Sequence, residues 1–92
     1  MFIGYLRVEL FIPHSRSLKD KRQVVLSIKQ RLRQRFNISI AEEPSDKWQR
    51  CRLACVYVNY HRGEVGNTLA KVEENVRNHI HFQVIDSEYE VF

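Results

Sequence analysis

The segment HSRSLKDKRQVVLSIKQRLRQRF, residues 14–36, decides the fold of this 92-residue chain. Its apolar residues recur at helical spacing and share one face: Leu18, Val25, Ile28, Leu32 and Phe36. This spacing predicts an amphipathic helix. Ser17 stands where an N-cap should be, and Asp20 follows three residues later, as in a capping box. The helix should therefore begin just after Ser17 and end near Arg35.

The predicted helix carries a large excess of positive charge. Residues 14–36 hold one acid, Asp20, and eight of the fifteen basic residues: Arg16, Lys19, Lys21, Arg22, Lys29, Arg31, Arg33 and Arg35. One edge of the apolar stripe carries four of them: Lys19, Arg22, Lys29 and Arg33. The other edge carries three: Lys21, Arg31 and Arg35. The face farthest from the stripe is polar and uncharged.

Two interpretations of these charges remain open. Long Lys and Arg stems can cover the rim of a core while their charged ends stay in water. A solvated helix, however, usually mixes charges of both signs. The shortage of acids therefore indicates contact with a polyanion.

Length and composition bound the remaining possibilities. Ninety-two residues with 43% apolar content predict a single globular domain, residues 1–92. No run of 18 apolar residues exists, so no membrane span is expected. Arg7 and Glu9 interrupt the apolar N-terminus, which favours a strand over a signal peptide and a cytoplasmic location. The net charge of residues 14–36 is near +7 and that of the remaining residues is near −3, which together give the +4 of the chain.

The cysteines and histidines predict no metal site. Cys51 and Cys55, four residues apart in a strand, would lie about 13 Å apart, too far for a disulfide. There is no second cysteine pair for zinc, and His79 and His81 have no third ligand. We expect both cysteines to be reduced packing residues, and no cofactor.

The rest of the chain alternates strands and one more helix. Residues 2–12, 37–41, 49–60 and 82–92 read as strands. A second helix is predicted because five apolar residues follow one another at helical intervals of four, three, four and four positions: Val65, Leu69, Val72, Val76 and Ile80. In the last strand, Ile85, Tyr89 and Val91 should share one face. Both faces of the third strand are largely apolar. Because one of them carries the charged Arg52, the opposite face, with Cys51 and Leu53, is favoured as the one that meets the helices.

This order predicts an α+β, ferredoxin-like βαββαβ sandwich, with a four-stranded antiparallel sheet and two helices on one face. The other face of the sheet should be open. It should carry an apolar set that is unusual for a solvent-facing surface: Ile3, Tyr5, Phe11, Val56, Val58 and Tyr60.

The motif Ser17-Leu18-Lys19-Asp20-Lys21-Arg22, with Arg35-Phe36-Asn37 and Trp48-Gln49-Arg50 after it, resembles the small bacterial YlxP-like family of unknown function. The opening strand, with Gly4, Leu6, Val8 and Leu10, is similar too, so the resemblance covers nearly the whole chain. It implies a ferredoxin-like fold and a bacterial cytoplasmic protein, with association with RNA or the ribosome. The chain departs from the family pattern at Asn59-Tyr60-His61, where Ser-Asn-Asp is usual. That puts any role of an acid there in doubt.

The leading functional hypothesis is binding of structured RNA, or association with the ribosome, through the basic edge of the first helix. The candidate residues are Arg16, Lys19, Arg22, Lys29 and Arg33. Contact with about four phosphates would give a slope near −3 for log affinity against log salt. The alternative is a homodimer, or base stacking, on the open face of the sheet through Tyr5, Phe11, Val56, Val58 and Tyr60. The sequence pattern of an RNA-recognition motif is absent from the third strand.

An enzyme is the least favoured hypothesis. Acyl-phosphate hydrolysis would suit the size and charge of the chain, but it needs a backbone cradle for phosphate. Residues 13–17 contain no glycine to form one, so no catalytic residue is predicted. Trp48 is expected to close the end of the core; the alternative is a stacking role, because Lys47, Arg50 and Arg52 surround it.

Overall fold

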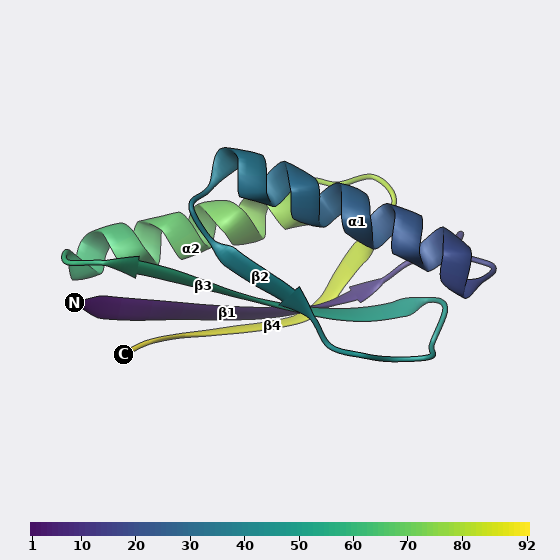
Figure 1. Cartoon of the computed structure of the whole chain (residues 1–92), viewed down its shortest axis with the longest axis horizontal. Coiled ribbons are helices and arrows are strands. Elements are labelled where there is room, and N and C mark those ends of the chain that lie inside the picture. The colour runs from purple at the N-terminus through teal and green to yellow at the C-terminus, as the bar shows by residue number, and fades with distance from the viewer.

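The computed structural model describes residues 1–92 and contains four strands and two helices. In chain order these are β1 (Phe2–Phe11), α1 (Leu18–Arg35), β2 (Ser39–Glu42), β3 (Arg50–Asn59), α2 (Arg62–Arg77) and β4 (Gln83–Val91). The strands form one sheet in the order β2-β3-β1-β4, and every neighbouring pair is antiparallel. Both helices lie on one side of this sheet (Figure 1). The predicted ferredoxin-like fold is thus confirmed.

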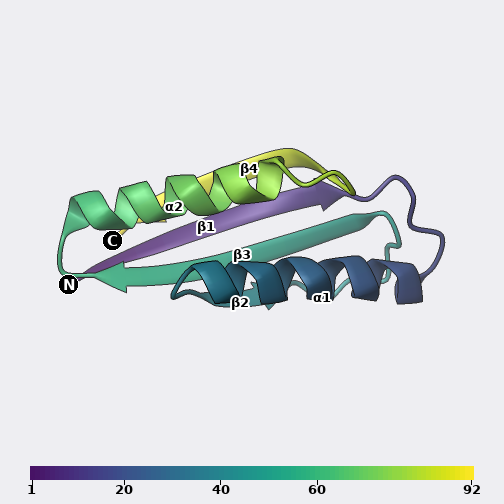
Figure 2. The same ribbon diagram turned by 90° about the horizontal axis from the view of Figure 1, so that it is seen from above.

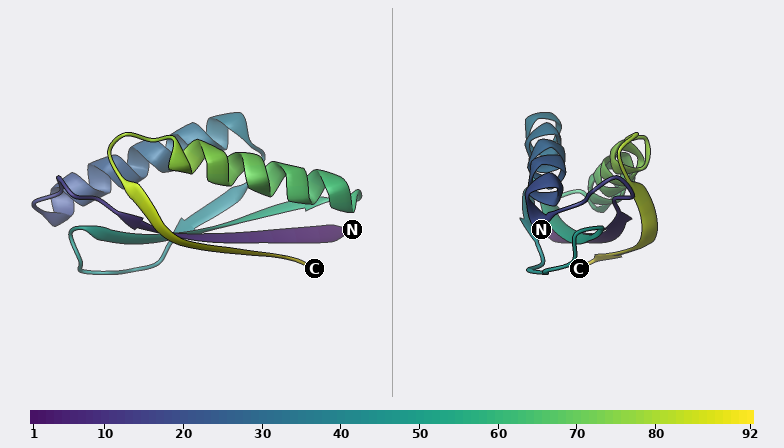
Figure 3. Two further views of the ribbon diagram at one scale, coloured as in Figure 1. Left: turned by 180° about the vertical axis from the view of Figure 1, so that it is seen from behind. Right: turned by 90° about the vertical axis from the view of Figure 1, so that its right-hand side faces the viewer.

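The two helices cover different parts of the sheet. Seen from above, α1 runs along the β2 side and α2 along the β1–β4 side, and the two are offset along the long axis (Figure 2). The molecule is correspondingly elongated, with extents of 42 × 20 × 18 Å. The end-on view shows the opposite face of the sheet uncovered by any helix (Figure 3).

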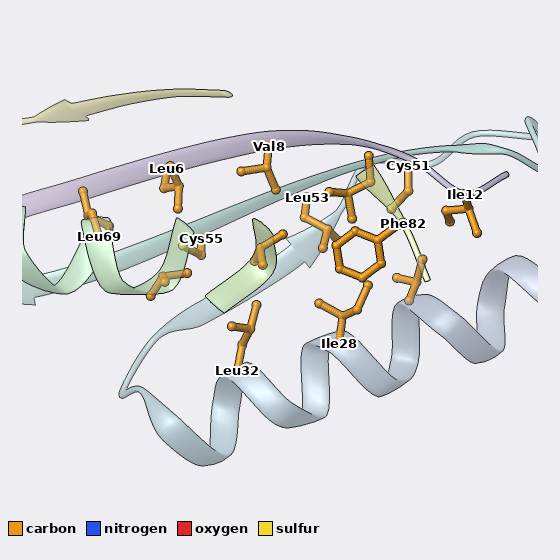
Figure 4. Close-up of a cluster of buried hydrophobic side chains, with 14 of the residues drawn as sticks. Leu6, Val8, Ile12, Ile28, Leu32, Cys51, Leu53, Cys55, Leu69 and Phe82 are labelled. Atoms are coloured by element: carbon orange, nitrogen blue, oxygen red, sulfur yellow. The ribbon is translucent and has the colours of Figure 1, made fainter. Parts of the chain in front are cut away.

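The core lies between the sheet and the helices. The even residues of β1 and the odd residues of β3 point into it, including Leu6, Val8 and Leu53 (Figure 4). The predicted inward face of β3 is thus confirmed. Cys51 and Cys55 are free thiols within this core, as expected. Burial raises their pKa values, to about 12 for Cys51 and about 11 for Cys55, so both stay protonated and unreactive at neutral pH.

Gly4 allows α2 to approach β1 closely. A Cβ placed at Gly4 would collide with the Cγ1 atom of Val65 and lie 2.8 Å from the Cδ1 atom of Leu69. The start of α2 therefore packs directly against the backbone of β1, and any larger residue at this position would push the helix away.

Two predictions about the end of the chain were wrong. Ile80 does not extend the stripe of α2, because the helix ends at Arg77 and Ile80 is 88% exposed; buried Phe82 completes the core instead. Ile85 does not share a face with Tyr89 and Val91 as predicted. The β1–β4 register shifts between Glu9 and Leu10, so Ile85 has no partner on β1. Such a bulge moves later side chains to the opposite face.

The buried face of α1 is rotated from its predicted position. Ser17 caps the helix as expected, since its hydroxyl accepts a hydrogen bond from the Asp20 N–H at 3.0 Å. Leu18 and Phe36, however, are only partly buried, whereas Lys21 is 2% exposed. The prediction that Lys21 lies on a solvated edge was therefore wrong. The Lys21 ammonium is accommodated because Glu42 lies 3.8 Å away and the Ser45 carbonyl accepts at 3.4 Å.

Candidate nucleic-acid interface

The predicted basic edge of α1 forms one straight row. Its four cations and one exposed leucine lie three, four, three and four positions apart, in the order Lys19, Arg22, Leu26, Lys29 and Arg33. Alternating steps of three and four keep side chains on one line along a helix. At 1.5 Å per residue the row is about 21 Å long. Arg16 precedes the helix at the same end as Lys19, and its backbone N–H donates to the Asp20 carboxylate at 3.0 Å.

The row faces the β2 side of the molecule and is accessible. Lys19, Arg22 and Arg33 are exposed, and Lys29 is half-buried. The Arg33 guanidinium donates a hydrogen bond to the Ile40 carbonyl at 3.1 Å, which ties the end of the row to β2. The structure thus brings the four predicted helix residues together on one surface, with Arg16 at its start.

Leu26 is a member of this surface that the sequence analysis missed. Its side chain is 51% exposed, although leucine is usually buried. Arg22 precedes it by four residues and Lys29 follows it by three, so all three lie on the same strip. The repeating three-and-four spacing was the available signal, but it is visible only when apolar and charged residues are read together.

The charges of α1 lack partners within the protein. Among the basic residues of 14–36, only Lys21 forms an ion pair. The single acid of the segment, Asp20, is already occupied by the Arg16 backbone N–H at the helix start. The row therefore presents an uncompensated positive potential to solvent, which is the condition for attracting a polyanion.

The open face of the sheet, by contrast, balances its charges internally. Arg7 lies 3.1 Å from Asp86 and 3.0 Å from Glu88, and these hydrogen bonds raise its pKa. Farther along, Arg52 lies 3.1 Å from Glu43 and 3.9 Å from Glu9. Positive charge in the centre of this face is thus already paired with carboxylates.

These ion pairs divide the predicted apolar face. At one end, the register places Ile3 beside Val58 and Tyr5 beside Val56, and Tyr60 follows with 78% exposure. Phe11 lies at the other end of β1, opposite Arg50, beyond the paired charges of Glu9 and Arg52. The structure therefore brings together Tyr5, Val56, Val58 and Tyr60, but not Phe11.

Trp48 does not close the core as expected. Its side chain is 54% exposed in the β2–β3 loop. The His79 and His81 rings lie 5.3 Å apart, but the Nδ1 atom of His79 accepts the His81 backbone N–H at 3.2 Å. His79 also stacks on Phe82 with ring centroids 4.4 Å apart, and burial lowers its pKa. Neither helix is both long and apolar enough to cross a membrane.

Comparison with known proteins identifies the family. Residues 3–89 match the family described as "Protein of unknown function (DUF503)". The uncharacterized protein YlxP of Bacillus subtilis (strain 168) is 35% identical over 71 residues, which cover 76% of this chain and 77% of that protein. A designed protein, Ferredog-Diesel, aligns over 98% of this chain and 83% of its own, with 17% identity and a TM-score of 0.49. The family match covers nearly the whole chain, so the chain belongs to the DUF503 family.

Proposed function

We propose that this protein binds structured RNA, either free or in the ribosome, through the cation row of α1. The observation that carries the proposal is the row of Lys19, Arg22, Lys29 and Arg33, which has no ion-pair partner in the protein. A straight row of cations can follow one phosphate backbone, and each phosphate contact releases counterions. Leu26, at its centre, would contact apolar sugar or base surfaces.

The alternative interpretation, a solvated rim over the core, accounts less well for this surface. A rim cation covers the core with its stem, which fits half-buried Lys29. Lys19, Arg22 and Arg33 are instead exposed, and a helix gains nothing from like charges at i,i+3 and i,i+4. Their arrangement is better explained by an external partner of opposite charge.

The proposal describes a binding module and not an enzyme. The loop before α1 uses its polar groups to hold the structure: the Ser15 hydroxyl donates to the Ser17 carbonyl at 3.1 Å, and Asp20 is engaged by Arg16. The exposed His14 is the one candidate base there, and no carboxylate pairs with it to orient its ring. We place the protein in the bacterial cytoplasm, where buried free thiols such as Cys51 and Cys55 remain reduced.

The test measures binding of ribosomal RNA by fluorescence anisotropy in low and high salt. For wild type, we expect a slope of about −3, or a roughly 60-fold loss of affinity between 50 and 200 mM salt. A variant with Lys19, Arg22, Lys29 and Arg33 changed to Gln should lose affinity by on the order of 100-fold at low salt.

A matched variant controls for net charge. Changing Arg31, Arg35, Arg62 and Lys71 to Gln also removes four positive charges, but from exposed positions outside the row. If the row is the site, this variant keeps most of its affinity. Equal losses in the two variants would show that only net charge matters, and unchanged binding in both would contradict the proposal.

A second candidate, self-association, is favoured by the apolar end of the open face. Ile3 is 39%, Val56 37% and Val58 48% exposed, and they are neighbours across β1 and β3. Apolar neighbours of this kind can pack against the same residues of a second copy about a two-fold axis. Sedimentation equilibrium should then show a dimer that Val58→Glu dissociates and Leu26→Glu does not. A monomer at high micromolar concentration would exclude this interface.

A further inference from the structure

The β2–β3 loop holds an exposed tryptophan in a defined position. Trp48 is 54% exposed, although its indole would bury a large apolar area if it entered the core. The loop around it is anchored. The amide nitrogen of Gln49 donates to the Pro13 carbonyl at 3.0 Å and to the Ser15 carbonyl at 3.3 Å. On its other side, the Lys21 ammonium donates to the Ser45 carbonyl. The exposure of Trp48 is therefore a feature of an organised loop.

The indole borders a groove that combines aromatic and cationic groups. The groove measures about 510 Å³ and is lined by Phe11, Asp46, Lys47, Trp48, Gln49 and Arg50. The Arg50 guanidinium lies over the Phe11 ring, 6.0 Å from its centroid. Lys47 is exposed and has no ion-pair partner. Aromatic faces beside free cations are the usual components of sites for single-stranded nucleic acid, where bases stack and cations hold the phosphates.

We propose that this groove binds an unpaired nucleobase of RNA, stacked on the Trp48 indole, with Lys47 at the neighbouring phosphate. The proposal rests on RNA binding by α1 and names the feature of the RNA that is recognised. Asp46 is the one acid in the lining and forms no ion pair, so its carboxylate is available to accept an N–H of the base. The favoured ligand is therefore an RNA with a loop or bulge and not a continuous duplex.

The position of the loop supports a single extended interface. Its hydrogen bonds reach residues 13–15, directly before Arg16, where the cation row starts. Figures 1 and 2 show the β2–β3 loop at the end of the molecule where α1 begins. An RNA hairpin whose stem follows α1 would thus bring its loop nucleotides toward this end.

The chain contains one tryptophan, so its fluorescence reports on this site alone. The experiment titrates the whole protein with a short oligouridylate, an RNA hairpin and a blunt duplex of the same stem. Tryptophan emission and the anisotropy of labelled RNA are measured together. We expect the oligouridylate and the hairpin to quench Trp48, and the duplex to leave its emission unchanged. Trp48→Ala should weaken hairpin binding about tenfold and leave duplex binding unchanged, whereas Trp48→Phe should keep most of the affinity.

A matched control lies at the other end of the sheet. Tyr60 is more exposed than Trp48 and follows the far end of β3, so Tyr60→Ala should leave hairpin binding unchanged. A tenfold loss in Tyr60→Ala, with none in Trp48→Ala, would move the stacking site to the open face and overturn the proposal.

The remaining outcomes separate this proposal from RNA binding by α1. If RNA binds and the four-residue α1 variant abolishes binding, but emission and Trp48→Ala affinity do not change, the base site is wrong and the α1 interface stands. Quenching by oligouridylate that persists in the α1 variant supports the base site and contradicts the α1 interface. If no RNA changes the anisotropy or the emission, both are overturned.

Discussion

The two helices cover the same sheet but present opposite kinds of outer surface. Each buries four residues, yet α2 buries Val65, Leu69, Val72 and Val76 whereas α1 includes the charged Lys21. On the outer face of α2 the charges are mixed, and Arg77 pairs with Glu73 at 2.9 Å. On the outer face of α1 the cations have no such partners.

This difference shows which charged residues join a helix to the rest of the fold. The carboxylate of Glu73 also accepts the Ser87 hydroxyl at 2.7 Å, so the charges of α2 help to join that helix to β4. In α1, Lys21 connects the helix to Glu42 and the β2–β3 loop, and Arg33 adds one hydrogen bond to the Ile40 carbonyl. The other cations of the row make no such contact, so we expect them to contribute little to folding.

The largest effect on stability should come from the inner faces, where the two helices are alike. Leu32 on α1 and Leu69 on α2 are each 2% exposed. Leu32→Ala and Leu69→Ala should each lower the free energy of unfolding by about 2–5 kcal/mol, through lost burial and the cavity left behind. Urea denaturation followed by circular dichroism measures both. A loss below about 1 kcal/mol for either variant would mean that its helix packs loosely, and it would contradict the claim that the inner faces of the two helices are alike.

Replacing Lys21 should cause the next largest loss of stability, and the loss should depend on the size of the side chain that replaces it. Lys21→Ala removes a buried stem and leaves the half-buried Glu42 carboxylate unpaired, so we expect a loss of about 2–3 kcal/mol. Lys21→Met leaves Glu42 equally unpaired but keeps the packed stem, so it should cost about 1 kcal/mol less than Lys21→Ala. The same denaturation experiment compares them. Equal costs would show that the ion pair, and not packing, is what α1 needs here.

On α2, the hydrogen bond from Ser87 should make the stability depend on pH. That bond, with a further contribution from Arg77, lowers the pKa of Glu73 from its usual 4.5. Because the unfolded chain takes up the proton first, the stabilisation is present above pH 4.5 and is lost as the pH falls through the lowered pKa. Ser87→Ala should raise the pKa of Glu73, measured by carboxyl NMR titration, and cost about 1 kcal/mol at neutral pH. An unchanged pKa in the variant would contradict this cause.

The smallest effect should come from the cation row itself. Changing Lys19, Arg22, Lys29 and Arg33 to Gln should alter the free energy of unfolding by no more than about 0.5 kcal/mol. On α2, Arg77→Gln should lose a few tenths, because it breaks an i,i+4 pair. A loss above about 1 kcal/mol in the four-residue variant would instead favour the rim interpretation, in which these side chains cover the core.

The sequence alone determined the order of the elements, the inward face of β1 and the capped start of α1. For β3, whose two faces are both largely apolar, it only favoured the face that lies inward. These features follow from local rules: alternation in a strand, three-and-four spacing in a helix, and a serine at an N-cap. The cations of the α1 row could be placed on one surface for the same reason, since a helix fixes which side chains are neighbours. Ile80 was wrongly placed on the α2 stripe because the local pattern continues after the chain has left the helix. Ile85 and Lys21 were misplaced within their elements, by a bulge and by a buried ion pair that no local pattern shows.

Only the tertiary structure decided which charges find partners. Lys21 and Lys29 are both lysines of α1, but Glu42 on β2 lies beside Lys21 alone. Arg7 is likewise paired because β4 brings Asp86 and Glu88 to it from 79 and 81 residues away in the chain. Trp48 stays in solvent, whereas Phe82, which follows α2, is buried in the core. A pattern in the sequence shows which residues share a face, but pairing and burial depend on contacts between distant segments, which only the folded chain creates.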